Sequence, residues 1–380
     1  MGESKAGPSP GGPGGLDALA AEGVAPWLGG LRRSLLSSGG RPGLLAGAAV
    51  RGASFCPEGL AADAVEDDGC REQLSLLARR PAAPDTAVLA LCAYDLRSAC
   101  DVLRPVFGTG HGGDGCVSMD VDAALARDAV GTVAAAGELH RAAGRSNALV
   151  KIPATGPGLA AVRACLRRGI GVHVTEIFSV RRYGEVLDAC LDGLEGARAA
   201  GHDLAALPVC TSLAAGRIEA GVDERLTALG TPQALALRGT AALAVARLAF
   251  RLYEERLGTA CWRRLAAAGA RPPRPLWDVV DDPADGAGRE LRRAETLVAW
   301  GTGVVLSPAG LAAAAGARPE GDTLTSRHDE AAALVAEVER LGVPFEATAA
   351  GLAAARLRRL ARAWRGLRRT VAEQLGAGAS

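Results

Sequence analysis

A lysine stands inside a short apolar run, where its amine could do covalent chemistry. Residues Ala148 to Ile152 are brief, apolar and closed by Pro153, which predicts a buried strand that contains Lys151. Burial strips water from an ammonium group and favours the neutral amine, which attacks carbonyl groups to form a Schiff base. Lys151 is therefore the candidate nucleophile. The alternative is a lysine that reaches solvent from a strand end or pairs with a carboxylate.

The composition of the chain also singles out this lysine. Of the 43 basic residues only Lys5 and Lys151 are lysines, and every other one is arginine. Arginine keeps its proton in proteins, whereas a desolvated lysine can lose it. A bias towards alanine, glycine and arginine depletes lysine as well, so composition supports the role of Lys151 without proving it.

The overall composition indicates a soluble globular protein. The chain has 380 residues, of which 49% are hydrophobic and 22% charged, and this length allows two domains or one α/β barrel. A net charge of +1 gives no reason to expect nucleic acid or a membrane surface as partner. The nine cysteines show no metal-binding spacing, and neither a signal peptide nor a membrane span is apparent, so we expect reduced thiols and a cytoplasmic protein.

Short apolar runs alternate with longer amphipathic stretches along most of the chain. We expect a disordered leader over residues 1–15 and one domain over 16–376. Eight strands are predicted, over 24–28, 44–50, 116–121, 148–152, 171–178, 207–213, 276–280 and 304–306. Helices are predicted over 89–106, 123–142, 158–168, 179–200, 214–229, 232–257, 329–341 and 352–374.

This alternation predicts a parallel sheet, and eight repeats suit an α/β fold of the closed (β/α)₈ (TIM) barrel type, with extra terminal helices. An open doubly wound sheet is the alternative, but no GxGxxG motif follows the first strand. The last predicted helix carries seven arginines between residues 356 and 369. We interpret them as a solvated face whose stems cover the barrel, rather than as a site for an anionic partner.

Polar side chains gather at the predicted carboxyl ends of the strands, where barrel enzymes carry out their chemistry. Asp120 could move protons, with a water held by Thr175. Ser212 and Arg217 could hold a phosphate, because arginine offers paired donors. The structural alternatives are β-propensity for Thr175, a hydrogen-bonded core residue for His173, and a surface ion pair for Arg217.

These residues resemble the active site of the transaldolase family, in particular its long-chain bacterial branch. The most specific match is Leu149-Val-Lys-Ile-Pro-Ala-Thr155 followed by Gly158-Leu159, and Val172 to Ser179 resembles the next strand of the family. The resemblance implies a (β/α)₈ barrel that transfers a dihydroxyacetone unit between sugar phosphates. It implies no metal or organic cofactor, and sugar-phosphate substrates as the partners. A homodimer is compatible with it.

The resemblance also assigns roles to individual residues. Lys151 matches the Schiff-base lysine, Thr175 the threonine that positions the catalytic water, and Ser212 and Arg217 the phosphate-binding positions. Asp120 stands where the family has a glutamate one strand before the lysine.

Several positions depart from the family pattern. Where the family has an acidic residue at the end of the first strand, this chain reads Trp27-Leu-Gly-Gly30. Alignment of the family's Thr-Thr-Asn-Pro run with Ala49 to Gly52 places Arg51 at the substrate-binding asparagine, and His173 replaces a second asparagine. Residues 279–283 are acidic where the family has a phosphate-binding cation.

Three functions are compatible with this pattern. The first is an active transaldolase, with Arg51 and His173 in place of lost substrate-binding groups. The second is a fructose-6-phosphate-type aldolase, which forms the same Schiff base but releases the three-carbon unit to water. The third is a catalytically impaired paralogue that binds sugar phosphate or a protein.

Overall fold

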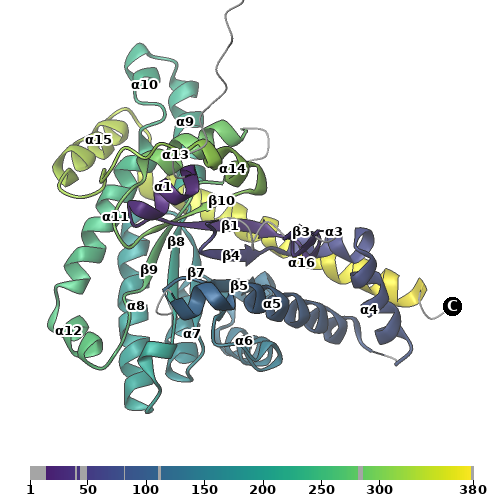
Figure 1. The fold of residues 1–380 in the computed structure, drawn as a ribbon. Helices are drawn as coiled ribbons and strands as arrows, with labels where there is room; N and C mark the ends of the chain where they lie inside the picture. The colour runs from purple at the N-terminus through teal and green to yellow at the C-terminus, as the bar shows by residue number, and fades with distance from the viewer. Residues whose placement is uncertain are drawn as a thin grey trace, which may run out of the picture.

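Eight parallel strands close into a barrel in this computed structural model, which describes residues 14–38, 41–42, 49–80, 82–109, 113–280 and 286–377 (Figure 1). Around the barrel the strands follow the order β1-β10-β9-β8-β7-β6-β5-β4. Their bounds are β1 Ala25–Leu31, β4 Gly52–Phe55, β5 Cys116–Asp120, β6 Ala148–Pro153, β7 Val172–Ile177, β8 Val209–Leu213, β9 Arg274–Asp278 and β10 Gly303–Leu306. The predicted (β/α)₈ barrel is confirmed.

Helices connect the strands and cover the outside of the barrel (Figure 1). They are α1 Gly15–Ala21, α3 Pro57–Glu66, α4 Asp68–Ala78, α5 Pro84–Thr109, α6 Ala129–Ala143, α7 Gly156–Arg167, α8 Val180–Ala199, α9 Ala215–Leu229, α10 Pro232–Ala236, α11 Ala241–Leu257, α12 Ala260–Ala267, α13 Ala287–Thr296, α14 Pro308–Ala313, α15 His328–Arg340 and α16 Phe345–Ala377. Short 3₁₀ turns lie at η1 Arg33–Leu35, η2 Ala123–Arg127, η3 Leu204–Ala206 and η5 Ala314–Gly316, and β2 Ser37–Ser38 pairs with β3 Arg41–Pro42. None of the described helices is long and apolar enough to cross a membrane.

Alternating side chains give the barrel two apolar layers. One set fills the interior below the site and consists of Ala25, Trp27, Cys116, Leu149, Cys210, Leu276 and Val305. The larger core lies between the outer faces of the strands and the helices. Each strand is thus buried on both faces, which explains why the strands read as short apolar runs.

The second predicted strand is wrong in position. The expected strand was 44–50, but residues 43–48 lie outside the described residues, and β4 begins only at Gly52. Gly52 packs against the indole of Trp27, where an added Cβ would come within 2.2 Å of the ring. The strand thus starts on a glycine that β-propensity disfavours, and the apolar run before it was the stronger sequence signal.

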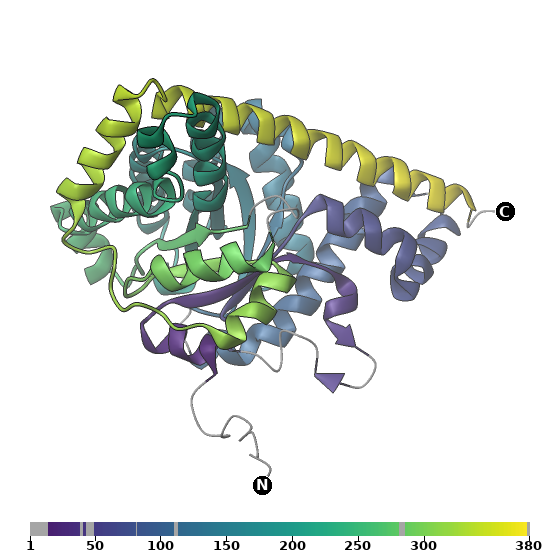
Figure 2. The ribbon, with the colours of Figure 1, turned by 90° about the horizontal axis from the view of Figure 1, so that it is seen from above.

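The long C-terminal helix α16 crosses the end of the barrel at which the strands terminate. It packs against α3, α4, α5, η2 and α9 and also contacts β7 (Figure 2). Arg368 of α16 forms ion pairs with Asp122, directly after β5, and with Asp85 at the start of α5. At the other terminus α1 begins at Gly15, and residues 1–13 of the expected leader lie outside the described residues.

Candidate active site

A cavity of about 670 Å³ opens at the carboxyl ends of the barrel strands, beneath α16. Six of the seven side chains predicted to form the site line it: Asp120, Lys151, His173, Thr175, Ser212 and Arg217. They come from β5, β6, β7, β8 and the first turn of α9. The closed barrel therefore brings together residues nearly 100 positions apart in the sequence.

Lys151 and Asp120 face each other on neighbouring strands. The two residues are in register between β6 and β5, and Lys151 Nζ lies 2.7 Å from Asp120 Oδ2. The ammonium also donates a hydrogen bond of 2.6 Å to the backbone oxygen of Phe55. Burial raises the pKa of the Asp120 carboxyl, and the Lys151 charge offsets only part of this effect. Asp120 is therefore placed to take the proton that Lys151 must lose before it can attack a carbonyl.

His173 is held by two hydroxyl groups on the floor of the cavity. Its Nδ1 lies 2.9 Å from Ser118 Oγ and its Nε2 lies 2.6 Å from Ser212 Oγ. The ring meets Trp27 edge-on, with centroids 5.7 Å apart. Burial, aided by the Lys151 charge, lowers the pKa of His173 well below its usual value, so the ring is neutral. Because both nitrogens are engaged, His173 can influence a ligand most directly through the Ser212 hydroxyl.

Two consecutive residues of β7 face the cavity, because the strand is irregular there. Thr175 and Glu176 both line the cavity, and the register with β8 shifts between Val174 and Ile177. Glu176 has φ +60°, a left-handed conformation that is uncommon outside glycine. The sequence prediction missed Glu176. The signal was a charged residue at a position that regular alternation would turn into the apolar outer layer.

Arg217, the predicted phosphate ligand, is joined by an acidic residue that the sequence prediction also missed. Its Nη1 donates to Asp278 Oδ2 over 2.7 Å, and Asp278 Oδ1 accepts a hydrogen bond from the backbone of Val280. Asp278 is the last residue of β9 and lines the cavity. The carboxylate orients the guanidinium and also adds negative charge where a phosphate would bind.

The structure does not bring Arg51 into the site. Arg51 precedes β4 and donates its backbone N–H to Pro26, so it lies at the amino-terminal end of the barrel. Its side chain lies 3.8 Å from Asp114, which also pairs with Arg274. The prediction failed because β4 begins later than expected. Cys56, which follows β4 directly, lines the cavity instead.

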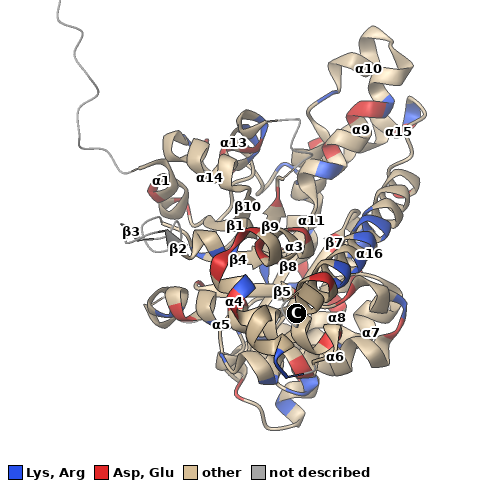
Figure 3. Cartoon of the chain, turned by 90° about the vertical axis from the view of Figure 1, so that its right-hand side faces the viewer, with Lys and Arg blue, Asp and Glu red and all other residues tan. Residues whose placement is uncertain are grey.

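The C-terminal helix contributes cations to the mouth of the cavity. Basic residues follow one another along α16 (Figure 3), and Arg356, Arg359 and Arg362 line the cavity. The prediction that the arginines of this helix form a solvated face is wrong for Arg356, which is largely buried at the cavity, whereas Arg359 and Arg362 are exposed to solvent at its mouth. On the opposite side of the mouth, β1 lines the cavity with Gly29 and Gly30, which carry no side chain.

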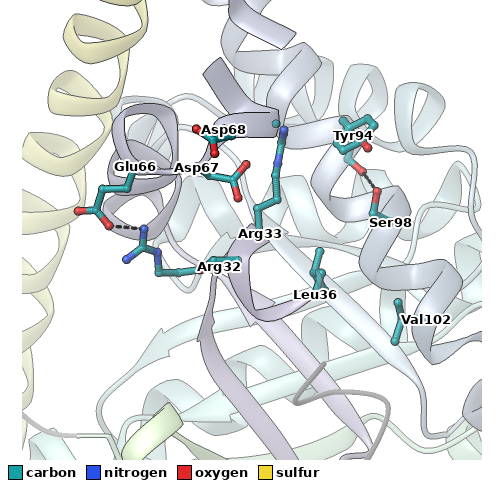
Figure 4. Close-up of a pocket in the computed structure, with 11 residues that line it drawn as sticks. Arg32, Arg33, Leu36, Glu66, Asp67, Asp68, Tyr94, Ser98 and Val102 are labelled. Carbon is teal, nitrogen blue, oxygen red and sulfur yellow. Dashed lines mark hydrogen bonds and ion pairs between the residues drawn. The ribbon is translucent and has the colours of Figure 1, made fainter. Parts of the chain in front are cut away.

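A second cavity, of about 730 Å³, lies outside the barrel between η1, α4 and α5 (Figure 4). Both of its arginines are paired: Arg32 bonds Glu66, and the buried Arg33 donates to Asp95 and stacks over Tyr94. This network ties the loop after β1 to the helices. None of the predicted site residues lies there.

Among the described residues, no group of three or more His, Cys, Asp or Glu side chains is arranged to hold a metal ion.

Comparison with known proteins gives a family consistent with this site. Residues 50–371 match the model of a family described as transaldolase/fructose-6-phosphate aldolase. A transaldolase of Parafrankia sp. strain EAN1pec is 41% identical over 96% of this chain and 99% of its own length. Transaldolase 1 of Streptomyces avermitilis is 41% identical over 96% of this chain and 97% of its own length, and the transaldolase of Thermobifida fusca is 42% identical over 95% and 98%.

The match begins just before β4, ends within α16 and leaves out β1, so it covers seven of the eight barrel strands, among them the strand that carries Lys151. The family expected from the motif around this lysine is confirmed, and with it a transaldolase-like class of function. The chain belongs to the transaldolase/fructose-6-phosphate aldolase family.

Proposed function

We propose that this protein is a transaldolase that uses Lys151 as a Schiff-base nucleophile and transfers a dihydroxyacetone unit between sugar phosphates. The observation that carries the proposal is the buried amine of Lys151, which lines the cavity 2.7 Å from the Asp120 carboxylate. An amine that attacks a ketone must first give up a proton, and this carboxylate is a base within hydrogen-bond distance of it.

The first half of the reaction forms the imine. Asp120 accepts the proton of the Lys151 ammonium, and the amine adds to the ketone carbon of the donor sugar. Loss of the former carbonyl oxygen as water then needs a proton, which Asp120 can return through a water molecule. Thr175, which lines the cavity on the neighbouring strand β7, is the residue we propose to hold that water.

The far end of the substrate carries a phosphate, for which we propose Arg217 together with Ser212. Arg217 reaches the cavity from the amino-terminal turn of α9, where backbone dipoles also favour an anion. The Ser212 hydroxyl is held at His173, which can fix its orientation for a substrate hydroxyl or phosphate oxygen. Arg51 is left out of this proposal because of its place at the other end of the barrel.

A cleavage reaction without transfer is the second candidate, because the family description covers fructose-6-phosphate aldolase as well. Gly29 and Gly30 give β1 no side chain to act on a substrate, which favours a weakened or altered transfer step. Homodimer formation and a cytoplasmic location stay predictions from the sequence.

Borohydride reduction in the presence of fructose 6-phosphate, followed by peptide mass analysis, tests the proposal. We expect an adduct on the peptide that contains Lys151, and none in Lys151→Met. Addition of erythrose 4-phosphate should yield sedoheptulose 7-phosphate if the protein is a transferase, and only free glyceraldehyde 3-phosphate and dihydroxyacetone if it is an aldolase. A wild-type protein that forms no adduct with any ketose phosphate would contradict both enzymatic functions.

A further inference from the structure

Glu176 has features that no packing requirement explains. Regular alternation along β7 would turn its side chain outward, towards the apolar layer beneath the helices. Instead, the strand forms an irregularity at this position, the residue adopts φ +60°, and the carboxylate lines the cavity. A left-handed conformation costs a non-glycine residue of order 1–3 kcal/mol and is concentrated at functional sites.

The carboxylate is buried and only half satisfied. The side chain is 10% exposed, and its Oε1 accepts one long hydrogen bond of 3.3 Å from Arg356 Nε. Oε2 is buried and has no hydrogen-bond partner among the residues that the structure describes. A buried carboxylate oxygen without a donor is costly, so a donor supplied by a ligand would bind there favourably.

The other acidic side chains of the cavity are less suited to bind a substrate hydroxyl. Asp120 is paired with Lys151, and Asp278 is paired with Arg217. Glu58 and Glu224 are exposed to solvent. On β1, which stands directly across the barrel from β7, only Gly29 and Gly30 line the cavity. Glu176 is also paired, with Arg356 over 3.3 Å, but among the described residues no donor reaches its Oε2, which leaves this oxygen for a substrate hydroxyl.

Glu176 also lies at a suitable height above the lysine. His173 pairs with Lys151 and Thr175 pairs with Pro153, which places Thr175 about 7 Å farther along the strand direction, towards the mouth, than Lys151. Glu176 follows Thr175. Consider a sugar that is bonded to Lys151 through its ketone carbon and extends towards Arg217. The carbons that follow the ketone carbon would then lie beside Glu176.

On the basis of the proposed Schiff base at Lys151, we propose that the Glu176 carboxylate is the base for carbon–carbon bond cleavage. It takes the proton from the hydroxyl two carbons away from the imine carbon. The oxygen lone pair left behind forms the carbonyl of the departing aldehyde. The bond that breaks joins the carbon that bore this hydroxyl to the carbon next to the imine carbon. Its electron pair moves to the iminium and gives an enamine. In transfer to an acceptor aldehyde the steps reverse, and Glu176 returns the proton to the new hydroxyl.

Glu176→Gln tests this role, because it keeps the shape of the side chain and removes the base. We expect cleavage and transfer to slow by about 10²-fold. Borohydride trapping of the donor ketose on Lys151 should persist, because the imine forms before the bond breaks. The matched control is Glu58→Gln, whose carboxylate also approaches Arg356, at 3.9 Å, but is exposed. Turnover of this control should stay within about twofold of wild type, because exposed ion pairs contribute little.

The pH profile provides a readout that a purely structural role would not change. Burial raises the pKa of Glu176, and the charges that act on it come from Arg356 on α16, Arg217 on α9, Asp278 on β9 and Asp120 on β5. The cleavage step of the wild-type protein should therefore slow on acidification at a higher pH than for an exposed glutamate, and Glu176→Gln should lose this dependence in single-turnover cleavage, while imine trapping keeps the dependence that the raised pKa of Asp120 causes.

Glu176→Gly guards against a variant that fails to fold, because glycine adopts φ +60° without strain. We expect this variant to be stable, to trap the ketose, to turn over slowly and to be partly rescued by added formate. Wild-type turnover in Glu176→Gln would overturn the proposal. So would an equal loss of trapping and cleavage in both variants, since Glu176 would then only shape the site. A wild-type protein that traps no ketose would instead contradict the Schiff-base function itself.

Discussion

The amine of Lys151 lies 2.7 Å from the Asp120 carboxylate, and the two residues occupy matching positions on adjacent strands of the barrel. Both are largely buried, and the backbone oxygen of Phe55 fixes the amine from a third strand-end. The pairing couples the charge of the nucleophile to a nearby proton acceptor. Substitution of one residue at a time tests the nucleophile and the proton acceptor separately.

Lys151→Arg should keep the ion pair with Asp120 and abolish covalent chemistry, because a guanidinium does not lose its proton. We expect turnover to fall by at least about 10⁴-fold, since the nucleophile is lost. Unfolding by urea should show a folded protein, and borohydride trapping should give no adduct. An adduct elsewhere in the chain would refute the assignment of the nucleophile.

Asp120→Asn should slow imine formation without removing the nucleophile. Loss of a positioned proton acceptor lowers rates by about 10²–10⁴-fold. The measurement is the rate at which ketose phosphate is trapped in single-turnover experiments. Slow trapping with full final yield supports the role, whereas a wild-type rate would show that the proton leaves by another route.

Asp278→Asn should strengthen the binding of phosphorylated substrates. The carboxylate is 2.7 Å from Arg217, so its removal eliminates repulsion of a phosphate while the amide oxygen can still orient the guanidinium. We expect KM for a ketose phosphate to fall about fivefold, which corresponds to ~1 kcal/mol. The corresponding unphosphorylated ketose is the control, and its KM should not change. A higher KM for the phosphate would mean that Asp278 chiefly positions Arg217.

Asp95→Leu should destabilise the fold outside the active site. Arg33 Nε lies 2.5 Å from Asp95 Oδ1, with both side chains buried, so the substitution leaves a buried cation without its main partner. Breaking such a pair costs about 3–5 kcal/mol, whereas replacing both members by apolar residues is often nearly neutral. Equilibrium urea unfolding of Asp95→Leu and of the double variant Arg33→Met/Asp95→Leu measures the difference. Equal stability of the two variants would contradict this role of the pair.

Glu176→Gln should be more stable than wild type at neutral pH and lose this advantage in acid. Because burial raises the pKa of Glu176, the folded protein binds this proton more tightly than the unfolded chain. The protonated Glu176 carboxyl contributes its full stabilisation below the pKa that it has in the unfolded chain. This stabilisation is lost as the pH rises through the pKa that it has in the folded protein. Glutamine imitates the neutral form. Thermal unfolding from acidic to neutral pH should show curves that diverge as the pH increases, and parallel curves would contradict the expected shift.

The sequence was informative wherever local chemistry determines local structure. The apolar run around Lys151, closed by Pro153, predicted β6, and the helix expected from residue 158 begins at Gly156, where the Thr155 hydroxyl caps it. It was misleading at β4, where Gly52 begins the strand because it packs against Trp27, a contact between distant residues. The incorrect placement of Arg51 followed from that error.

The sequence by itself determined the alternation of strands and helices, the barrel and the single buried lysine, because hydrophobic periodicity and turn residues act over a few neighbouring positions. Only the tertiary structure decided which charges share the cavity. Closure of the barrel sets Asp278 against Arg217, a strand irregularity turns Glu176 inward, and α16 brings arginines to the mouth. These relationships depend on strand register and helix packing between segments far apart in the chain, which no local pattern encodes.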